Sequence, residues 1–517
     1  MKTISKIAHI ETFAYLGFFY LLAHGGIFFI SDAIYWDDWA LWNHQSNSIM
    51  ELSNMIGSMF NLLGYLHISM LSIGPWLYKI LIFVLMFFSG IFLWFILRRQ
   101  CWISKEARFL IVLLFLILPL NSARITMATF LYTLCYFSFF AGWYFLEKNR
   151  LLAICFFFFS FNTNSMLVFY ILPISEWFLR NGNILNIKKD WQLGLQKLDF
   201  ILLPFVFFSI KNIFFRPYGL YEGYNTHFNI KNLVASPLYM GIDLTQLDVS
   251  VLLLIIIMFC GFLIFRKHKQ MLLSYTTDNR ILYSGIIAFF CGIFPYCLIG
   301  KTPTFYEWTS RHQLLMPLGS ALILTWAFNY FPETVRRQLI MFVIGLSLAF
   351  NIQVYSHLFM DWQKQKSIIS LLGDSDEIKN ANLVIFMDDS ENALKRTYRF
   401  YEWNALMKMA YSDEKRFGLN MSEVNKYITG EFDIYFIERY NAGTHIRSEL
   451  ENKIIVQVAP LAKDFFRKCK KMFEKKPMYE LRIISSSSRV VTSHSLLKSL
   501  STVKGTTKLT QGKYEQY

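Results

Sequence analysis

Two adjacent carboxylates, Asp37 and Asp38, stand between Trp36 and Trp39 near the start of the chain. Neighbouring residues point about 100° apart on a helix and to opposite faces on a strand, so the pair does not form a symmetric acid site. We expect one carboxylate to act as general base on a hydroxyl and the other to orient a substrate or hold a cation. The indole rings can stack on a sugar. A solvated acidic loop with aromatic anchors is the alternative.

A second candidate group lies in the segment 216–227, where proline and glycine predict a turn. The guanidinium of Arg216 matches phosphate oxygens, and the neighbouring aromatic and acidic residues can line a pocket. An aromatic-belt loop with a snorkelling arginine is the other interpretation. The candidate substrate-binding residues of this segment are Arg216, Tyr221, Glu222 and Tyr224.

A third candidate group, in the segment 301–312, combines cations with a carboxylate and a histidine. Positive charge at its end is placed to stabilise a departing phosphate, a kind of preorganised electrostatics that dominates many active sites. Simple membrane anchoring is the alternative for the arginine. The candidate substrate-binding residues here are Lys301, Glu307, Arg311 and His312.

The elements that must position these residues are membrane helices. The chain has 517 residues, of which 54% are hydrophobic, and apolar stretches of roughly 17–25 residues recur along it. This pattern predicts an α-helical polytopic membrane protein with about 10–11 transmembrane helices. We predict spans near 13–31, 76–97, 107–122, 126–146, 151–179, 198–214, 249–265, 282–300, 313–331 and 338–354.

The placement of lysine and arginine predicts the orientation of these spans. Clusters of basic residues lie between apolar spans, at 98–108, 148–150 and 180–197. The segment from Asp32 to Tyr78, by contrast, contains no lysine or arginine. By the positive-inside rule the clusters face the cytoplasm. Arg150 and Arg180 then share a side only if 151–179 crosses twice as a hairpin. The extracytoplasmic side is predicted to receive the loops 32–75, 215–248 and 301–312 and the region after 355.

Within the first loop, Ile49–Ile73 is apolar at roughly helical spacing, which predicts interfacial helices along the membrane. Ordinary loop packing is the alternative. We expect six residues to face lipid: Met50, Met55, Met59, Leu62, Leu63 and Leu66.

The C-terminal region has a different composition. Short strands are predicted at 382–387, 432–437, 453–458 and 479–484, with helical stretches at 390–409 and 422–428. We therefore predict a transmembrane domain over 1–355, a small C-terminal α/β extracytoplasmic domain over 356–484, and a disordered tail over 485–517. The positive-inside pattern accounts for most of the net charge of +15, so no nucleic-acid partner is expected.

This arrangement resembles the GT-C superfamily of integral-membrane glycosyltransferases, in particular bacterial O-antigen glucosyltransferases and related surface-polysaccharide enzymes. The residues that carry the resemblance are Asp37-Asp38 in the first large extracytoplasmic loop, the Ile49–Ile73 stretch and the domain after 355. The resemblance implies that Asp37 or Asp38 is the base. It also implies a polyprenyl-phosphate sugar donor, a glycan or lipid-linked acceptor, and a multi-pass protein of the bacterial inner membrane.

The sequence leaves several alternatives open. A polymerase of lipid-linked repeat units has the same kind of donor, and a flippase or transporter of lipid-linked glycans, or a non-enzymatic envelope assembly protein, belongs to another class. No convincing internal repeat favours a transporter. A divalent cation, Mg²⁺ or Mn²⁺, is a candidate cofactor in some members of the superfamily. Asp388-Asp389 after a predicted strand superficially resembles the metal motif of nucleotide-sugar transferases.

Overall fold

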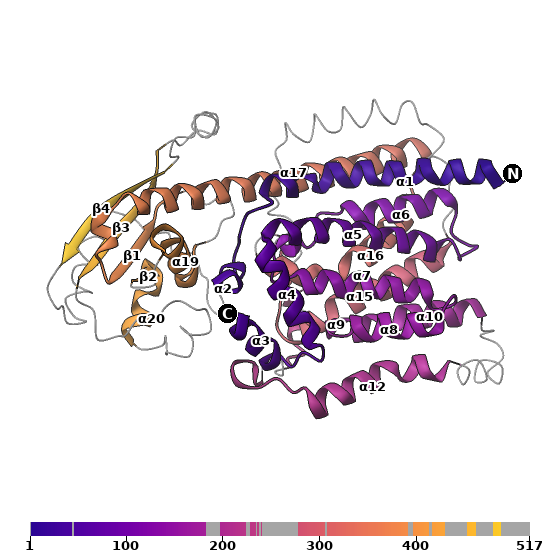
Figure 1. The fold of residues 1–517 in the computed structure, drawn as a ribbon. Coiled ribbons are helices and arrows are strands. Elements are labelled where there is room, and N and C mark those ends of the chain that lie inside the picture. Colours follow the sequence, from indigo (N-terminus) through magenta and orange to yellow (C-terminus); the bar gives the residue numbers. More distant parts are fainter. Residues whose placement is uncertain are drawn as a thin grey trace. The chain divides into compact units, whose positions relative to one another are not determined.

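The computed structural model describes residues 2–43, 46–181, 197–223, 228–233, 235–236, 239, 278–305, 308–390, 397–412, 416–429, 452–461 and 479–487. The chain divides into two compact units. The first contains Met1–Asp38 and Gln45–Phe359, and the second contains Trp39–His44 and Met360–Tyr517. The first unit is helical, and the second carries the β-sheet (Figure 1).

Four helical segments among the described residues are long and apolar enough to cross a membrane. They are Ile10–Ile30, made of most of α1 (Lys2–His24) and the 3₁₀ helix η1 (Gly25–Ile30); α5 (Pro75–Leu97); α15 (Asn279–Leu298); and α17 (Glu333–Gly373). The structure therefore supports a helical protein with membrane-spanning segments. The count of 10–11 crossings stays a prediction.

The other predicted spans correspond to shorter apolar helices. The helix over 107–122 ends at Ile117 because Pro119 disfavours helical backbone at the residue before it. The span predicted at 198–214 is helical over the same residues, and the span predicted at 249–265 lies outside the described residues. These helices are α6 (Lys105–Ile117), α7 (Phe130–Phe145), α8 (Arg150–Ser160), α9 (Ser165–Phe169), α10 (Ile171–Asn181), α12 (Leu198–Phe214) and α16 (Met316–Phe328).

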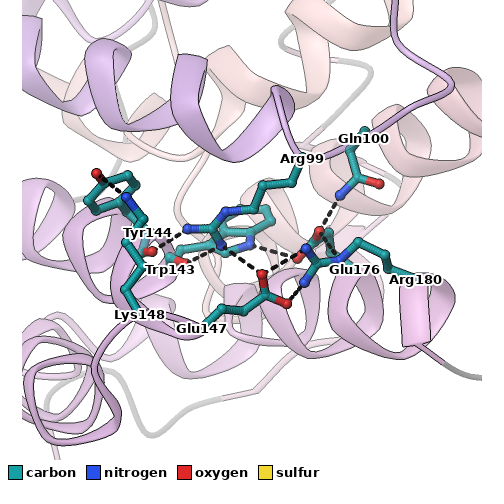
Figure 2. A network of polar contacts seen from close by, with 8 residues as sticks. All are labelled: Arg99, Gln100, Trp143, Tyr144, Glu147, Lys148, Glu176 and Arg180. Carbon is teal, nitrogen blue, oxygen red and sulfur yellow. Dashed lines mark hydrogen bonds and ion pairs between the residues drawn. The ribbon is translucent and has the colours of Figure 1, made fainter.

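The segment 151–179 forms a hairpin, as predicted. Helix α8 ends at Ser160, and the chain returns through α9 and α10 to Arg180. Arg180 forms an ion pair with Glu147, which lies just before α8. Figure 2 shows this polar network, in which Arg99 lies 3.9 Å from Glu147 and Glu176 accepts a hydrogen bond from Trp143. The C-terminal ends of α5 and α7 and the two ends of the hairpin therefore meet at one end of the helices.

The first loop contains three helices: α2 (Asp38–Asn43), α3 (Ser46–Met55) and α4 (Asn61–Ile73). The turn at Gly57 has φ +74°, and an added Cβ would lie 2.3 Å from the carbonyl oxygen of Phe215. Glycine is therefore required where this loop approaches the end of α12. Of the six residues expected to face lipid, Leu62 is 74% exposed, but Leu63 is buried, so the prediction for Leu63 is wrong. It lies on the side of α4 that packs inward.

Helix α17 continues past the predicted end at residue 354 and enters the second unit. Its apolar positions Leu358, Trp362, Ile368 and Leu372 keep helical spacing and are buried, which explains why the helix does not stop at the predicted domain boundary.

The second unit contains a four-stranded sheet in the order β2-β1-β3-β4 (Figure 1). Its strands are β1 (Leu383–Asp388), β2 (Phe417–Asn420), β3 (Lys453–Pro460) and β4 (Tyr479–Ser487). β1 pairs in parallel with β2 and β3, and β3 pairs antiparallel with β4. The helices are α18 (Asp376–Lys379), α19 (Phe400–Tyr411) and α20 (Val424–Thr429). The indole of Trp403 stacks 4.0 Å from the ring of Phe386 and joins α19 to β1.

Three of the four predicted strands are present, whereas 432–437 lies outside the described residues. The short strand β2 was not predicted. Of the predicted helix over 390–409, residues 391–396 lie outside the described residues, and α19 covers Phe400 onward. Strand β4 extends three residues into the predicted tail, to Ser487.

Candidate functional site

Asp38, at the first position of α2, is completely buried. Its Oδ1 accepts a hydrogen bond of 2.8 Å from the backbone N–H of Ala128, and a backbone group of Met127 also bonds to the carboxylate. Burial raises the pKa of Asp38 to about 6, opposed mainly by the nearby ammonium of Lys79. The carboxylate is thus held rigidly and titrates near the pH at which a general base is most effective.

Lys79 lies one turn into α5 and is also completely buried. Its Nζ donates a 2.6 Å hydrogen bond to the carbonyl oxygen of Ile125 and lies 5.5 Å from the ring centre of Tyr35. The Tyr35 hydroxyl in turn donates to the carbonyl oxygen of Leu358 on α17. These bonds fix a cation beside Asp38 and attach both to the segment Asn121–Thr129.

The segment Asn121–Thr129 includes the 3₁₀ helix η2 (Ser122–Ile125) and is bonded to the 3₁₀ helix η5 (Trp308–Gln313). The hydroxyls of Ser122 and Ser310 lie 2.9 Å apart. The backbone N–H of Asn121 donates to Oε1 of Gln313 at 3.0 Å. The structure therefore joins the first loop and the 301–312 loop through a segment that sequence reasoning did not single out.

Four buried polar atoms of these elements have no hydrogen-bond partner among the described residues: Asp38 Oδ2, Asn121 Oδ1, His312 Nδ1 and Gln313 Nε2. Buried polar atoms in native proteins are nearly always paired, so each of these atoms calls for an explanation. A carboxylate, an amide oxygen, an imidazole nitrogen and an amide nitrogen are the groups that bind hydroxyl-rich ligands. The arrangement is therefore a candidate polar binding site.

An aromatic stack connects Trp36 with Arg311. The ring of Trp36 lies 5.9 Å from that of Trp308, and the guanidinium of Arg311 lies 4.2 Å from the Trp308 ring centre. Trp36 has φ +50°, a left-handed conformation that costs roughly 1–3 kcal/mol in a residue with a side chain. Such strain is typical of functional sites. The stack brings a tryptophan of the acidic motif near a cation of the third loop.

His312 is buried, with its ring 5.3 Å from that of Tyr296. Burial lowers the pKa of His312 far below its ordinary value, and the positive charges of Arg311 and Lys301 lower it further, against a hydrogen bond to the Thr302 backbone. The imidazole is therefore neutral at physiological pH. Positive charge at this end of the loop therefore comes from Arg311 and not from the imidazole, because desolvation disfavours the imidazolium. Its neutral ring remains available for hydrogen bonding.

The 216–227 loop is placed differently. Arg216 is exposed just after the end of α12, and its side chain donates to the carbonyl oxygen of Asn212 in that helix. The backbone N–H of Tyr218 bonds to the carbonyl oxygen of Met55, so this loop lies against α3. Tyr221 ends the 3₁₀ helix η3 (Gly219–Tyr221) and Glu222 follows it, exposed. Three further predicted residues are not placed in the site: Tyr224 and Glu307 lie outside the described residues, and Trp39 belongs to the second unit.

Arg124 was also missed by sequence reasoning. It lies in η2, is buried, and its guanidinium is 2.6 Å from both ring nitrogens of His24. No carboxylate within the described ranges pairs with it. A sequence signal existed for both missed cations. Arg124 stands alone on the side predicted to be poor in cations, and Lys79 is an ionisable residue inside an apolar helix.

A metal site is not formed by the described residues, in which no three histidine, cysteine or acidic side chains group together. Asp388 instead forms a buried ion pair of 2.5 Å with Lys364 of α17. The likeness of Asp388-Asp389 to a metal motif is therefore not supported, because the carboxylate that ends β1 already has a cation.

No protein-family model matches the chain, and comparison with the curated proteins and the solved structures found no match. The evidence for function is therefore the site itself.

Proposed function

We propose that this chain is an integral-membrane glycosyltransferase that transfers a sugar from a polyprenyl-phosphate donor to a hydroxyl of a glycan or lipid-linked acceptor. The observation that carries the proposal is the buried Asp38, whose Oδ1 accepts a hydrogen bond from the backbone N–H of Ala128 while Oδ2 has no partner among the described residues. A fixed carboxylate with one oxygen left to accept a proton is the arrangement that a general base requires.

In the proposed reaction, Oδ2 of Asp38 takes the proton of the acceptor hydroxyl. The acceptor oxygen forms a bond to the anomeric carbon of the sugar as the bond from that carbon to the phosphate oxygen breaks. The electron pair leaves with the polyprenyl phosphate. Attack opposite to the leaving group inverts the configuration at the anomeric carbon.

The cations then have a defined task. The leaving phosphate gains negative charge, and Arg311 offers a planar guanidinium held in place by Trp308. Lys79 keeps the pKa of Asp38 lower than burial alone would set it. The indole of Trp36 offers a face on which a sugar ring can stack. The cellular setting that fits this chemistry is cell-surface polysaccharide biosynthesis at the extracytoplasmic face of a bacterial inner membrane.

Matched variants of the two neighbouring aspartates test this assignment. Asp38→Asn keeps the shape and removes the base, and we expect sugar transfer to fall by about 10²-fold or more. Asp37→Asn, the control, changes a half-buried carboxylate one residue away and should cost much less. The assay follows a radiolabelled sugar from a polyprenyl-phosphate hexose in membranes with equal protein levels. Near wild-type transfer by Asp38→Asn would reject the mechanism, and a larger loss in Asp37→Asn would move the base to Asp37.

A further inference from the structure

Lys211 lies in the last turn of α12, a helix that is otherwise strongly apolar. Its Nζ donates a 2.9 Å hydrogen bond to Oδ1 of Asn164, in the break between α8 and α9. Within the described ranges, no carboxylate lies at ion-pair distance from it. An ammonium in an apolar helix without a counter-charge is costly, and such residues commonly mark a substrate or ion site.

Lys211 lies on the side of α12 that packs against α8, one turn after the buried Phe207. The helix packs beside α8 (Figure 1), and its other side carries the exposed apolar residues Phe205, Phe208 and Ile213. Asn164 is itself exposed and Lys211 is half-buried. The pair therefore lies at the edge of this contact, at the surface of the helical unit.

The depth of Lys211 follows from the two ends of α12. At the start of the helix, Asp199 pairs with Arg150 at 2.7 Å, next to the network of Glu147, Arg180 and Arg99. Arg99 follows the C-terminal end of α5, whereas Lys79 lies near its N-terminal end. Lys211 is thus at the same end of the helices as Lys79, close to where Phe215 approaches Gly57 of the first loop. By the placement of lysine and arginine, this end of the helices is the predicted extracytoplasmic end.

Polar groups continue from this pair toward the candidate site. Ser165, adjacent to Asn164, lies with its hydroxyl 3.1 Å from that of Tyr296. The ring of Tyr296 contacts the ring of His312, and Arg311 precedes His312. A lysine that only anchored the helix would extend into water, but Lys211 bonds into this polar series.

We propose that Lys211 and Asn164 form a binding site for the phosphate headgroup of a prenyl lipid at the lateral surface of the helical unit. The ammonium pairs with the phosphate, the amide of Asn164 donates to a phosphate oxygen, and the prenyl chain lies along the apolar face of α12. The inference rests on the proposed function, because it assigns the place where the lipid-linked substrate enters before it reaches Arg311.

The test uses the full-length protein in a neutral detergent and measures equilibrium binding of radiolabelled farnesyl phosphate. Lys211→Gln should weaken binding about tenfold or more, the order expected for loss of one charge-assisted contact. Lys211→Arg should retain it. Lys105→Gln, which removes an exposed cation at the start of α6, is the control and should bind like the wild type. Farnesol binding should be equal in all four proteins, which also reports that each variant is folded.

Several outcomes would overturn the proposal. Equal farnesyl phosphate binding by Lys211→Gln and wild type would exclude the site, and so would equal weakening by Lys105→Gln. Inorganic phosphate that displaces the lipid as well as farnesyl phosphate does would show a site for free phosphate instead. Asp38→Asn separates the two proposals: it should lose sugar transfer but keep Lys211-dependent binding. If binding depends on Lys211 but no transfer is found in wild type, the proposed function fails and this site stands.

Discussion

Burial of the Asp38 carboxylate should make the protein less stable at neutral pH than in acid. Its pKa rises from 3.8 to about 6, so the folded state binds the proton more tightly than the unfolded state. Below about pH 3 the side chain is neutral in both states and costs nothing. As the pH rises to about 6, the free-energy cost of the buried charge grows, and above that pH it is constant. A shift of one pKa unit corresponds to about 1.4 kcal/mol, so the rise from 3.8 to about 6 costs roughly 3 kcal/mol of stability.

Asp38→Asn removes this cost and should therefore stabilise the protein while abolishing its activity. The advantage over wild type should be absent near pH 3, grow between about pH 4 and pH 6, and then level off. Part of it is offset because buried Lys79 loses its opposite charge. The double variant Asp38→Asn/Lys79→Met removes both charges and should recover the full difference. Thermal unfolding in detergent over this pH series is the measurement. A difference that did not change with pH, or that fell as pH rose, would refute the burial argument.

Three further predictions follow from the same geometry. Lys79→Met should raise the pKa of Asp38. The rate of sugar transfer, which increases as Asp38 loses its proton, should then increase at a higher pH than in wild type, whereas Lys79→Arg should leave this pH unchanged. A pH–rate profile of each variant measures this. Arg311→Ala should lower the rate of sugar transfer about tenfold to a hundredfold. Arg311→Lys should recover only part of that rate, because an ammonium does not replace a planar guanidinium. Initial rates of transfer measure both, and a full wild-type rate in Arg311→Lys would contradict the phosphate role. Lys364→Met leaves Asp388 buried without its cation and should destabilise the second unit by about 3–5 kcal/mol. The double variant Lys364→Met/Asp388→Leu should recover most of the lost stability, and limited proteolysis measures it. Equal protease sensitivity of Lys364→Met and wild type would count against the buried ion pair.

Hydrophobicity and charge placement predicted much of the fold. The spans at 76–97 and 198–214 and the hairpin over 151–179 are present as helices, because apolar length and positive clusters report directly on local structure. The extension of α17 into the second unit was not predicted, because a hydropathy window ends where polar residues appear even when buried positions keep helical spacing. Strand β2 was missed because it has only four residues.

The candidate site was predicted only in part. The acidic motif and the 301–312 loop were identified because unusual residues are clustered in sequence. Lys79 and Arg124 were not, because each is a single cation whose role depends on contacts with distant segments: Lys79 with Ile125, and Arg124 with His24. The neutral state of His312 depends on burial, which one sequence does not report. Spacing finds local motifs, but which side chains share a site is decided by tertiary packing.

The central claim is that the chain breaks the bond between a sugar and a polyprenyl phosphate. The most direct measurement uses membranes of the cells that carry this chain natively, supplied with a panel of radiolabelled polyprenyl-phosphate hexoses, with gene-deleted membranes as the blank. The account predicts that, for one of the hexoses, label moves to a glycan or lipid acceptor and free polyprenyl phosphate accumulates, dependent on the chain and lost in Asp38→Asn. Passage of the intact labelled donor across the membrane, with no label on an acceptor, would contradict it and identify a transporter.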